Sequence, residues 1–234
     1  MAVPLRHELK FFISPVQYQV LSRTLRAALS PDPHGDENNQ YHIRSLYFDT
    51  VNDDALYEKI SGTANRNKYR IRIYNFSDRI IRLECKSKYR DLISKRSVPI
   101  SRDLAEQLIS ADPTGLDTTT SGLVSDVFRE MRTNLLHPVV IVDYLREAYL
   151  HPAEEVRITF DMQLRSGLGS IDLFNPYLPT VPPFNHDEII LEVKYNQVLP
   201  PYIANLLSSA LRDGAVQSAI SKYVWCRRFE FKDY

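Results

Sequence analysis

The chain has 234 residues, and its 29 lysine and arginine side chains are balanced by 29 aspartate and glutamate side chains. A formal net charge of zero argues against a general nucleic-acid binder, because such proteins depend on a large positive charge. The length suits one domain with a sizeable core, so we expect a single domain over residues 1–234.

Cysteine content and hydropathy limit the cellular compartments in which the protein is expected. Cys85 and Cys226 are too few for a disulfide framework and are not spaced as zinc ligands. The longest strongly apolar stretch, 139–142, is far too short to cross a bilayer, and the N-terminal MAVPLRHELK lacks the apolar region of a signal peptide. We therefore expect a cytoplasmic protein with reduced thiols and no membrane-embedded segment.

Capping residues and apolar periodicity predict the helices. Ser14, Pro15 and Gln17 form the pattern of an N-cap, a first helical residue and a capping-box partner. Pro138 ends an amphipathic stretch, because proline cannot continue a helix. In chain order, helices are expected at about 15–29, 102–111, 123–135 and 201–212, the last being the final clear helix.

Alternation of side-chain type predicts the strands. Two hairpins are expected, one over 68–88 with its turn near 75–78, and one with its turn at 151–155. A proline-rich loop is expected at 176–183. The remaining expected strands, and those of the second hairpin, cover about 5–11, 42–49, 95–100, 139–150, 156–164 and 189–195.

The strands share an unusual pattern, in which charged residues occupy every second position and apolar residues the positions between them. One face of each strand is therefore charged, and the other packs on protein. In the first hairpin the charged positions are Lys68, Arg70, Arg72, Arg82, Glu84, Lys86 and Lys88. In the other strands the polar positions are Arg6, Glu8, Lys10, Arg157, Thr159, Asp161, Glu192 and Lys194.

Stacked like charges repel, so the pattern is costly unless an anion with several charges lies between the strands. A closed barrel points alternate side chains into its lumen, and helices outside it would cover the apolar face. We therefore expect an α+β fold, a closed antiparallel β-barrel with a charged lumen and flanking helices outside.

Seven short motifs follow one another along the chain: RHELKF at 6–11, RSLYFD at 44–49, KYRIR at 68–72, ECK at 84–86, RITFD at 157–161, LEVKY at 191–195 and SKY at 221–223. In this order they resemble the polyphosphate polymerase domain of the vacuolar transporter chaperone (VTC) family. That family belongs to the wider CYTH or triphosphate tunnel group. The resemblance implies an antiparallel barrel that binds triphosphate in its lumen.

One position departs from the wider group. Its hydrolases and cyclases tend to carry Glu-x-Glu-x-Lys at the start, whereas here Arg6 takes the place of the first acid. A base at this position weakens metal-assisted hydrolysis and favours the polymerase branch.

Basic side chains of the charged faces are expected to bind phosphate. The guanidinium groups of Arg70 and Arg72 match phosphate oxygens bidentately, and Lys10, Lys86 and Lys194 would act as point charges. The resemblance extends this set. The residues expected to be catalytic are Lys10, Arg70, Arg72, Lys86, Arg157 and Lys222. Those expected to bind phosphate are Arg44, Lys88, Lys95, Tyr144, Arg146, Lys194 and Ser221.

Carboxylates weaken anion binding unless they hold a metal or orient a base. Glu192 is the first choice as a ligand of Mg²⁺ or Mn²⁺, since these ions prefer hard oxygen ligands that bridge to substrate phosphate. Glu8, Glu84 and Asp161 are candidates for a second ligand. For each of these three, pairing with a neighbouring arginine or lysine is the favoured alternative.

The predicted function is an ATP-dependent polyphosphate polymerase, which transfers the γ-phosphoryl of ATP to a growing inorganic polyphosphate chain. Ionised phosphate is itself the nucleophile, so no protein base is required. Two alternatives stay open: a metal-dependent inorganic or nucleoside triphosphatase on the same fold, and a non-catalytic polyphosphate- or nucleotide-binding module. ATP and inorganic polyphosphate are the expected ligands, nucleic acid is not expected, and a membrane protein is left open as a partner.

Overall fold

The computed structural model describes residues 7–89, 92–114, 122–151, 155–183, 188–211 and 215–230. Arg6, the middle of the turn expected at 151–155, and Arg212 lie outside these residues. The chain divides into two compact units. The first unit comprises Met1–His42, Tyr144–Leu164 and Phe184–Ser221, and the second comprises Ile43–Asp143, Arg165–Pro183 and Lys222–Tyr234. The structure defines each unit by itself, so the single domain expected over 1–234 stays a prediction.

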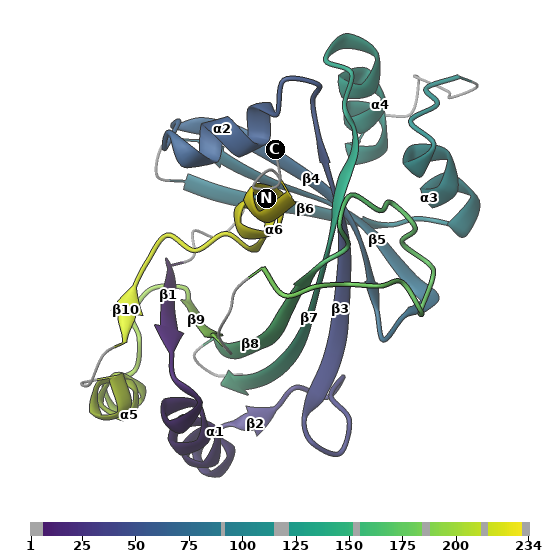
Figure 1. The fold of residues 1–234 in the computed structure, drawn as a ribbon. Helices are drawn as coiled ribbons and strands as arrows, with labels where there is room; N and C mark the ends of the chain where they lie inside the picture. Colours follow the sequence, from purple (N-terminus) through teal and green to yellow (C-terminus); the bar gives the residue numbers. More distant parts are fainter. Residues whose placement is uncertain are drawn as a thin grey trace. The chain divides into compact units, whose positions relative to one another are not determined.

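The strands of the described residues form one ten-stranded sheet (Figure 1). The pairings β1–β10, β1–β9, β2–β7, β3–β4, β4–β5, β5–β6 and β8–β9 are antiparallel. Its order is β10-β1-β9-β8-β7-β3-β4-β5-β6, with β2 paired to β7 off this path. The strands are β1 (His7–Ile13), β2 (Ser30–Pro31), β3 (Gln40–Asp49), β4 (Asn65–Tyr74), β5 (Ser77–Tyr89), β6 (Leu92–Pro99), β7 (His137–His151), β8 (Val156–Ser166), β9 (Ile189–Tyr195) and β10 (Val216–Gln217).

The order has two ends, β10 and β6, and within the described residues no pairing joins them. The expectation of a closed barrel is therefore corrected to an antiparallel sheet with flanking helices. The physical reason lies in β10, whose two residues pair only with Phe11 and Phe12 of β1. So short a strand offers too few backbone groups to form the seam of a barrel.

Six helices accompany the sheet in the described part of the chain. They are α1 (Pro15–Ala28), α2 (Asp54–Ile60), α3 (Arg102–Ile109), α4 (Leu123–Thr133), α5 (Pro201–Leu211) and α6 (Lys222–Glu230). The capping box predicted at Ser14 is confirmed, because Ser14 Oγ accepts from the Gln17 N–H and Gln17 Oε1 accepts from the Ser14 N–H. None of these helices is long and apolar enough to span a bilayer.

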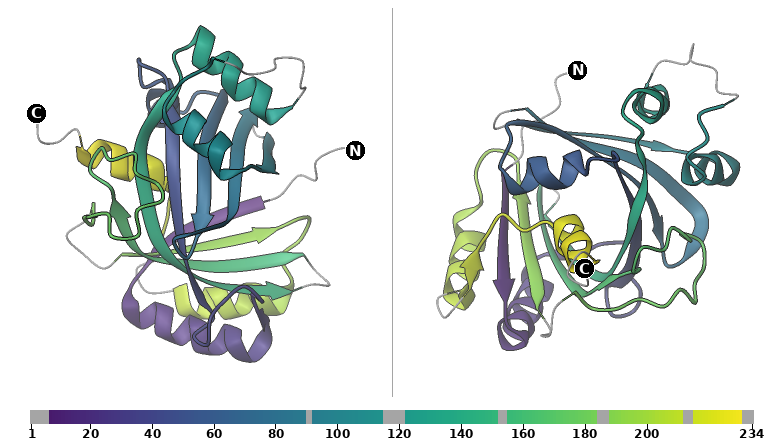
Figure 2. Two further views of the ribbon diagram at one scale, coloured as in Figure 1. Left: turned by 90° about the vertical axis from the view of Figure 1, so that its right-hand side faces the viewer. Right: turned by 45° about the horizontal axis from the view of Figure 1, so that its top comes forward.

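The apolar face of the second unit packs against α3 and α4, as Figure 2 shows. Ile71 of β4 and Leu83 of β5 are fully buried beside Leu108 of α3 and Val127 of α4. The hairpin turn is shorter than predicted. Asn75 and Phe76 alone connect the strands, both with positive φ, as a two-residue turn matched to strand twist requires.

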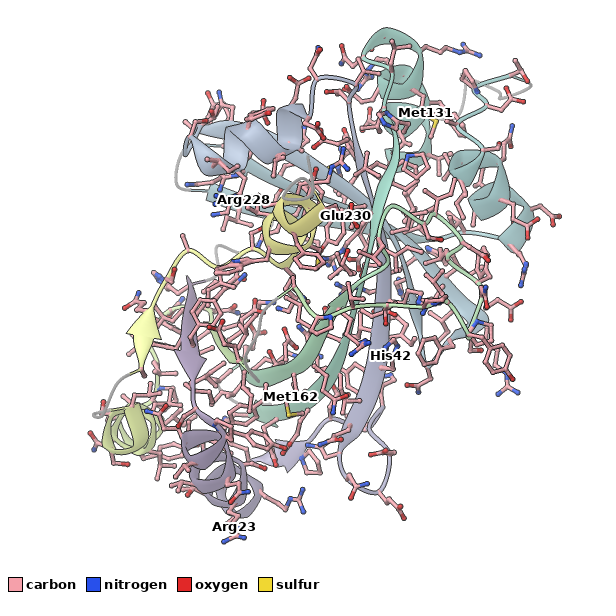
Figure 3. The ribbon with its side chains drawn as sticks, in the orientation of Figure 1. Arg23, His42, Met131, Met162, Arg228 and Glu230 are labelled. Atoms are coloured by element: carbon pink, nitrogen blue, oxygen red, sulfur yellow. The ribbon has the colours of Figure 1, made fainter. Side chains whose placement is uncertain are left out.

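The first unit has its own core, formed by β1, β7, β8 and β9 with α1 and α5. Phe160 and Leu191 are fully buried beside Leu25 of α1 and Ile203 of α5, and α1 and α5 contact each other. Figure 3 marks one core methionine in each unit, Met162 in the first and Met131 in the second. Apolar strand faces packed on helices are thus confirmed for both units.

One further boundary differs from its prediction, and two helices were missed. Pro138 does not end α4, which stops at Thr133, because Leu135 takes a positive φ and β7 begins at His137. The helices α2 and α6 were not predicted. Each is short, and tertiary contacts described below stabilise it more than its own periodicity does.

Candidate functional site

The second unit places one carboxylate, Glu84 of β5, in the centre of a basic surface. Arg70 of β4 pairs with Glu84, and Lys86 of β5 pairs with Lys95 of β6. Cross-strand partners project from the same face of a sheet, so these side chains share one face. We call this surface the β4–β5 face; it comprises Arg70, Arg72, Glu84, Lys86, Lys88 and Lys95.

Glu84 is 2% exposed and contacts three cations. Arg70 donates from Nε and Nη2 to Glu84 Oε2 at 2.7 and 2.6 Å. Lys95 Nζ lies 2.5 Å from Oε1, and Arg72 Nη1 lies 3.9 Å from Oε2. One carboxylate therefore offsets only part of the positive charge, and the surplus can attract an anion.

The pKa values of this cluster follow from burial and charge. Burial alone would raise the pKa of Glu84, but Arg70, Arg72 and Lys95 hold it well below its ordinary value. The pKa of Lys95 falls to about 8, because burial and the two arginines outweigh the attraction of Glu84, although half of this side chain is exposed. Glu84 is thus ionised at neutral pH, and Lys95 loses its proton at a pH only slightly above neutral.

Two residues of β3 hold the arginines, a role that sequence reasoning missed. Tyr47 Oη accepts from Arg70 Nη1 at 2.8 Å, and Ser45 Oγ accepts from Arg72 Nε at 3.1 Å. The available signal was the two-residue period of β3, which places both residues on one face.

Arg44 lies on the opposite face of β3 from Ser45 and Tyr47. The register pairs it with Ile73 on the apolar face of β4. Leu46 and Phe48 follow Arg44 at steps of two residues, so the sequence also places Arg44 on the same face as these apolar side chains. The structure therefore does not bring Arg44 to the β4–β5 face.

The Arg44 guanidinium is instead bound within the protein. It is 1% exposed and donates to Asp143 from Nε at 2.9 Å and from Nη2 at 2.8 Å. It also donates to the backbone carbonyl of Asn175. Arg44 thereby joins β3, β7 and the loop before β9.

Lys222 is the first residue of α6, and a buried contact anchors this helix. The Tyr223 hydroxyl donates to the carboxylate of Asp49, which is fully buried at the end of β3. Asp49 also accepts from the backbone N–H groups of Ala55 and Leu56 at 2.8 and 3.1 Å. One carboxylate thus ties α2 and α6 to β3, which accounts for both unpredicted helices. Ser221, just before α6, is described with the first unit.

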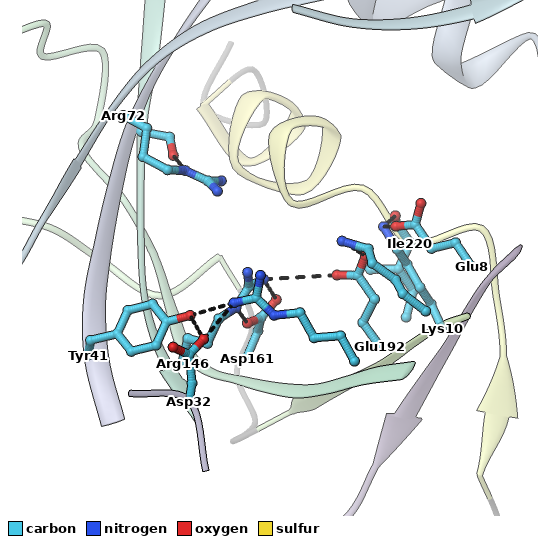
Figure 4. A network of polar contacts seen from close by, with 12 residues as sticks. Glu8, Lys10, Asp32, Tyr41, Arg72, Arg146, Asp161, Glu192 and Ile220 are labelled. Atoms are coloured by element: carbon cyan, nitrogen blue, oxygen red, sulfur yellow. Dashed lines mark hydrogen bonds and ion pairs between the residues drawn. The ribbon is translucent and has the colours of Figure 1, made fainter. Parts of the chain in front are cut away.

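The first unit carries a second polar surface, shown in Figure 4. Lys10 of β1 pairs with Glu192 of β9, and Arg157 of β8 pairs with Lys194 of β9. We call this surface the β8–β9 face; it comprises Glu8, Lys10, Arg146, Arg157, Thr159, Asp161, Glu192 and Lys194.

Lysines and carboxylates alternate on β1 and β9. Lys10 Nζ lies 3.0 Å from Glu8 Oε1 and donates to the Ile220 carbonyl at 3.3 Å. Lys194 Nζ lies 2.8 Å from Glu192 Oε1. Burial alone would lower the pKa of Lys10, but Glu192 and Glu8 raise it above its ordinary value, so Lys10 is protonated.

Arg146 of β7 is 7% exposed and binds Asp161 bidentately. Its Nε and Nη2 donate to Asp161 Oδ1 and Oδ2 at 2.6 and 2.8 Å, and Nη2 lies 3.9 Å from Glu192 Oε2. Tyr144 stacks under the guanidinium, with the ring centroid 5.3 Å from Cζ. The sequence predicted these four residues as site residues, and the first unit brings them together.

Arg157 is held by two residues that were not predicted. Its Nη2 donates to Asp32 Oδ2 at 2.9 Å and to Tyr41 Oη at 2.8 Å. Burial alone would raise the pKa of Asp32, but hydrogen bonds from His34 and the charge of Arg157 keep it below its ordinary value. No local sequence signal links Asp32, in a loop, to Arg157, 125 residues further on.

A divalent metal would need carboxylate oxygens that are grouped and available to bind it. In the described ranges no three His, Cys, Asp or Glu side chains are grouped to hold a metal ion. Glu8, Glu84 and Asp161 each pair with a basic side chain. Glu192, which is 5% exposed on the polar face, is also paired, with Lys194 Nζ 2.8 Å from its Oε1. A single carboxylate with substrate phosphates fits the way Mg²⁺ is usually held.

An antiparallel sheet with one face packed on helices and the other lined by arginine, lysine and isolated carboxylates defines the class of fold, and solved structures share it. A proposed adenylyl cyclase from Hippeastrum with a dominant triphosphatase activity has this fold, at 14% identity and a TM-score of 0.58, covering 97% of this chain and 96% of that one. A proposed adenylate cyclase from Bacillus halodurans matches with 14% identity and a TM-score of 0.54, covering 94% and 97%.

Within this class the chain belongs to the VTC domain family, whose model matches residues 5–231. The match includes all seven motifs, and it confirms the family predicted from them. No curated protein sequence matches the chain significantly.

Proposed function

We propose that this protein is an ATP-dependent polyphosphate polymerase, which transfers the γ-phosphoryl of ATP to the end of an inorganic polyphosphate chain. The observation that carries the proposal is the β4–β5 face, where Arg70, Arg72 and Lys95 share the single buried carboxylate of Glu84. Such a surplus of fixed cations suits a polyanion that is held through successive transfers.

The proposed chemistry uses positioning and charge. Phosphoryl transfer spreads negative charge over the transferred group, so preorganised guanidinium and ammonium groups stabilise the transition state. The terminal phosphate of the chain is an ionised nucleophile and requires no general base. We assign the catalytic contacts to Lys10, Arg70, Arg72, Lys86, Arg157 and Lys222, and further phosphate contacts to Lys88, Lys95, Tyr144, Arg146, Lys194 and Ser221.

A divalent ion, Mg²⁺ or Mn²⁺, would be held by Glu192 together with substrate phosphates. When bound, it would neutralise charge on the phosphates that bridge to it. Arg44 receives a different role in this proposal. Because its donors are engaged by Asp143 and Asn175, we assign it to positioning β3, and with it Ser45 and Tyr47.

The protein is proposed to act in the cytoplasm, where ATP is available and where the buried cysteines Cys85 and Cys226 would stay reduced. A membrane protein that receives the product is a proposed partner. The main rival is a triphosphatase, supported by the activity named for the Hippeastrum protein.

Incubation with ATP and Mn²⁺ or Mg²⁺ tests the proposal. We expect ADP and a ladder of phosphate polymers on a gel. Cleavage of tripolyphosphate to orthophosphate without any polymer would instead establish the triphosphatase.

Substitution of Glu192 separates catalysis from binding. Glu192→Gln should retain tripolyphosphate binding and lose metal-dependent turnover by at least about tenfold, because the proposed metal ligand is removed while its cationic neighbours Lys194 and Arg146 remain. Glu155→Gln, which changes an exposed carboxylate in the turn just before β8, serves as the matched control with wild-type turnover. If wild type and Glu192→Gln are equally inert yet bind equally, the protein is a binding module.

A further inference from the structure

We propose that Thr159 is a further substrate-binding residue, whose hydroxyl donates a hydrogen bond to a phosphate oxygen on the β8–β9 face. This inference rests on the proposed phosphate-binding function. It assigns a contact to a neutral side chain that neither the motifs nor the charge pattern singled out for binding.

The first observation is an unpaired hydroxyl. Thr159 lies in the middle of β8 and is 3% exposed. Its Oγ1 is buried, and no partner for it is found in the part of the chain that the structure describes. A hydroxyl can donate one hydrogen bond, and buried hydroxyls in folded proteins are almost always paired. The unpaired donor therefore calls for an acceptor from outside the protein.

The second observation is the place of this hydroxyl in the register. Thr159 pairs with Glu192 across β8 and β9, so its side chain shares the polar face with that carboxylate. Its acidic neighbours are engaged elsewhere, Glu192 with Lys194 at 2.8 Å and Asp161 with Arg146 at 2.6 Å. The neighbouring carboxylates thus pair with lysine and arginine side chains and do not accept a hydrogen bond from the Thr159 hydroxyl.

The third observation is a second unpaired donor on the same strand. Arg157, two residues before Thr159, uses Nη2 for Asp32 and Tyr41, but its buried Nε has no partner among the described residues. Residues two apart on a strand lie on one face, roughly 6.6 Å from each other. Two donors that lack acceptors on one face, with Lys10 and Lys194 nearby on β1 and β9, suit a ligand with several anionic oxygens.

Replacement of the hydroxyl by a methyl group tests this contact. Thr159→Val keeps the β-branched shape, and binding is measured by titrating inorganic tripolyphosphate calorimetrically with EDTA present, so that no metal takes part. We expect the dissociation constant to rise by about tenfold or more, as for loss of one hydrogen bond to a charged acceptor. The melting temperature of the ligand-free protein should stay equal or rise, because a buried unpaired hydroxyl is removed.

Two further variants complete the design. Thr159→Ser keeps the hydroxyl and should bind within about threefold of wild type. Thr24→Val is the matched control, because the Thr24 hydroxyl already donates to the Val20 carbonyl at 2.8 Å on α1, and its dissociation constant should be that of wild type. If Thr159→Val does not fold, the comparison of Thr159→Ser with Thr159→Ala decides, with weaker binding expected only for alanine.

The outcomes separate this inference from the proposed function. Wild-type binding by Thr159→Val, in a protein that still makes polyphosphate, overturns the contact and leaves the polymerase intact. Weaker binding by Thr159→Val, together with a wild-type protein that makes no polyphosphate, upholds the contact and overturns the polymerase. A lower melting temperature of ligand-free Thr159→Val would show a structural hydroxyl, and absence of tripolyphosphate binding by wild type would also overturn the inference.

Discussion

Glu84 illustrates how a buried carboxylate can serve a surface that binds anions. It partly neutralises Arg70, Arg72 and Lys95, which would otherwise repel one another, and it holds the Arg70 guanidinium by two contacts. Pairing therefore stabilises the ligand-free protein, while the excess of cations remains for substrate. Removal of the carboxylate should be tolerated only when an external anion replaces it.

We predict that Glu84→Gln lowers the free energy of unfolding of the ligand-free protein by about 3 to 5 kcal/mol, because it leaves the largely buried guanidinium groups of Arg70 and Arg72 without their carboxylate. Saturating tripolyphosphate should restore much of this loss in a thermal or urea denaturation. Glu106→Gln is the control, since the Glu106 pair with Arg102 at 2.8 Å is exposed and should contribute about 0 to 1 kcal/mol. An unchanged stability of Glu84→Gln would contradict the central role of this carboxylate.

Lys95 predicts a pH dependence. Its pKa of about 8 means that the folded protein loses this proton between pH 7 and 9, and affinity for tripolyphosphate should fall in that window. The unfolded chain keeps the proton up to about 10.5, so the free energy of unfolding without ligand should rise with pH between 8 and 10.5. Lys95→Arg stays protonated throughout and should lose this affinity step, although the ligand titrates equally in both. Identical pH profiles of tripolyphosphate affinity for wild type and Lys95→Arg would show that Lys95 does not cause the pH dependence.

At the scale of elements, buried carboxylates attach helices to the sheet. Asp49 joins α2 and α6 to β3. Glu147 of β7, which is 1% exposed, accepts from Tyr18 at 2.5 Å and from Ser22 at 2.6 Å, both on α1. Helices with modest periodicity of their own are thereby held at defined places, and α6 carries the proposed catalytic Lys222.

We predict that Tyr223→Phe loosens α6. Loss of the hydroxyl leaves Asp49 with backbone donors only, at an expected cost of about 1 to 2 kcal/mol. Amide hydrogen exchange of 222–230 should accelerate, and turnover should fall because Lys222 is less well positioned. Tyr57→Phe provides the comparison, because Tyr57 is 61% exposed on α2. Unchanged amide exchange of α6 would show that the hydrogen bond between Tyr223 and Asp49 does not anchor this helix.

For the whole molecule, segregation of charge matters more than its sum. Equal numbers of acidic and basic groups leave no net attraction for polyanions at long range. Basic residues are nevertheless concentrated on the β4–β5 face and the β8–β9 face, where carboxylates lie between them. Short, highly charged phosphate chains should fit such surfaces better than a nucleic-acid backbone, which carries its charges further apart.

We predict that tripolyphosphate at 100 times its dissociation constant stabilises the folded protein by about 2.7 kcal/mol, which raises the melting temperature by about 5 to 10 °C. The shift should shrink as salt concentration rises, as expected for charge-dominated binding. Single-stranded RNA at the same phosphate concentration should give a clearly smaller shift. An equal shift with RNA would contradict the exclusion of nucleic acid.

The amino-acid sequence by itself determined which side chains share a face. Alternation predicted that Arg70, Glu84 and Lys86 lie together, and the register confirms it, because period two is a property of every strand. Local capping predicted α1 for the same kind of reason. The motifs predicted the family, which the VTC domain match confirms.

Only the tertiary structure decided which charges meet and which polar atoms stay unpaired. Asp32 reaches Arg157, and Asp49 reaches Tyr223, across more than a hundred residues, so no local pattern encodes these contacts. Among the residues that the structure describes, the open ends of the sheet and the unpaired hydroxyl of Thr159 likewise depend on how strands are ordered. Periodicity constrains the side of a strand on which a residue lies, whereas strand order and register decide what it faces.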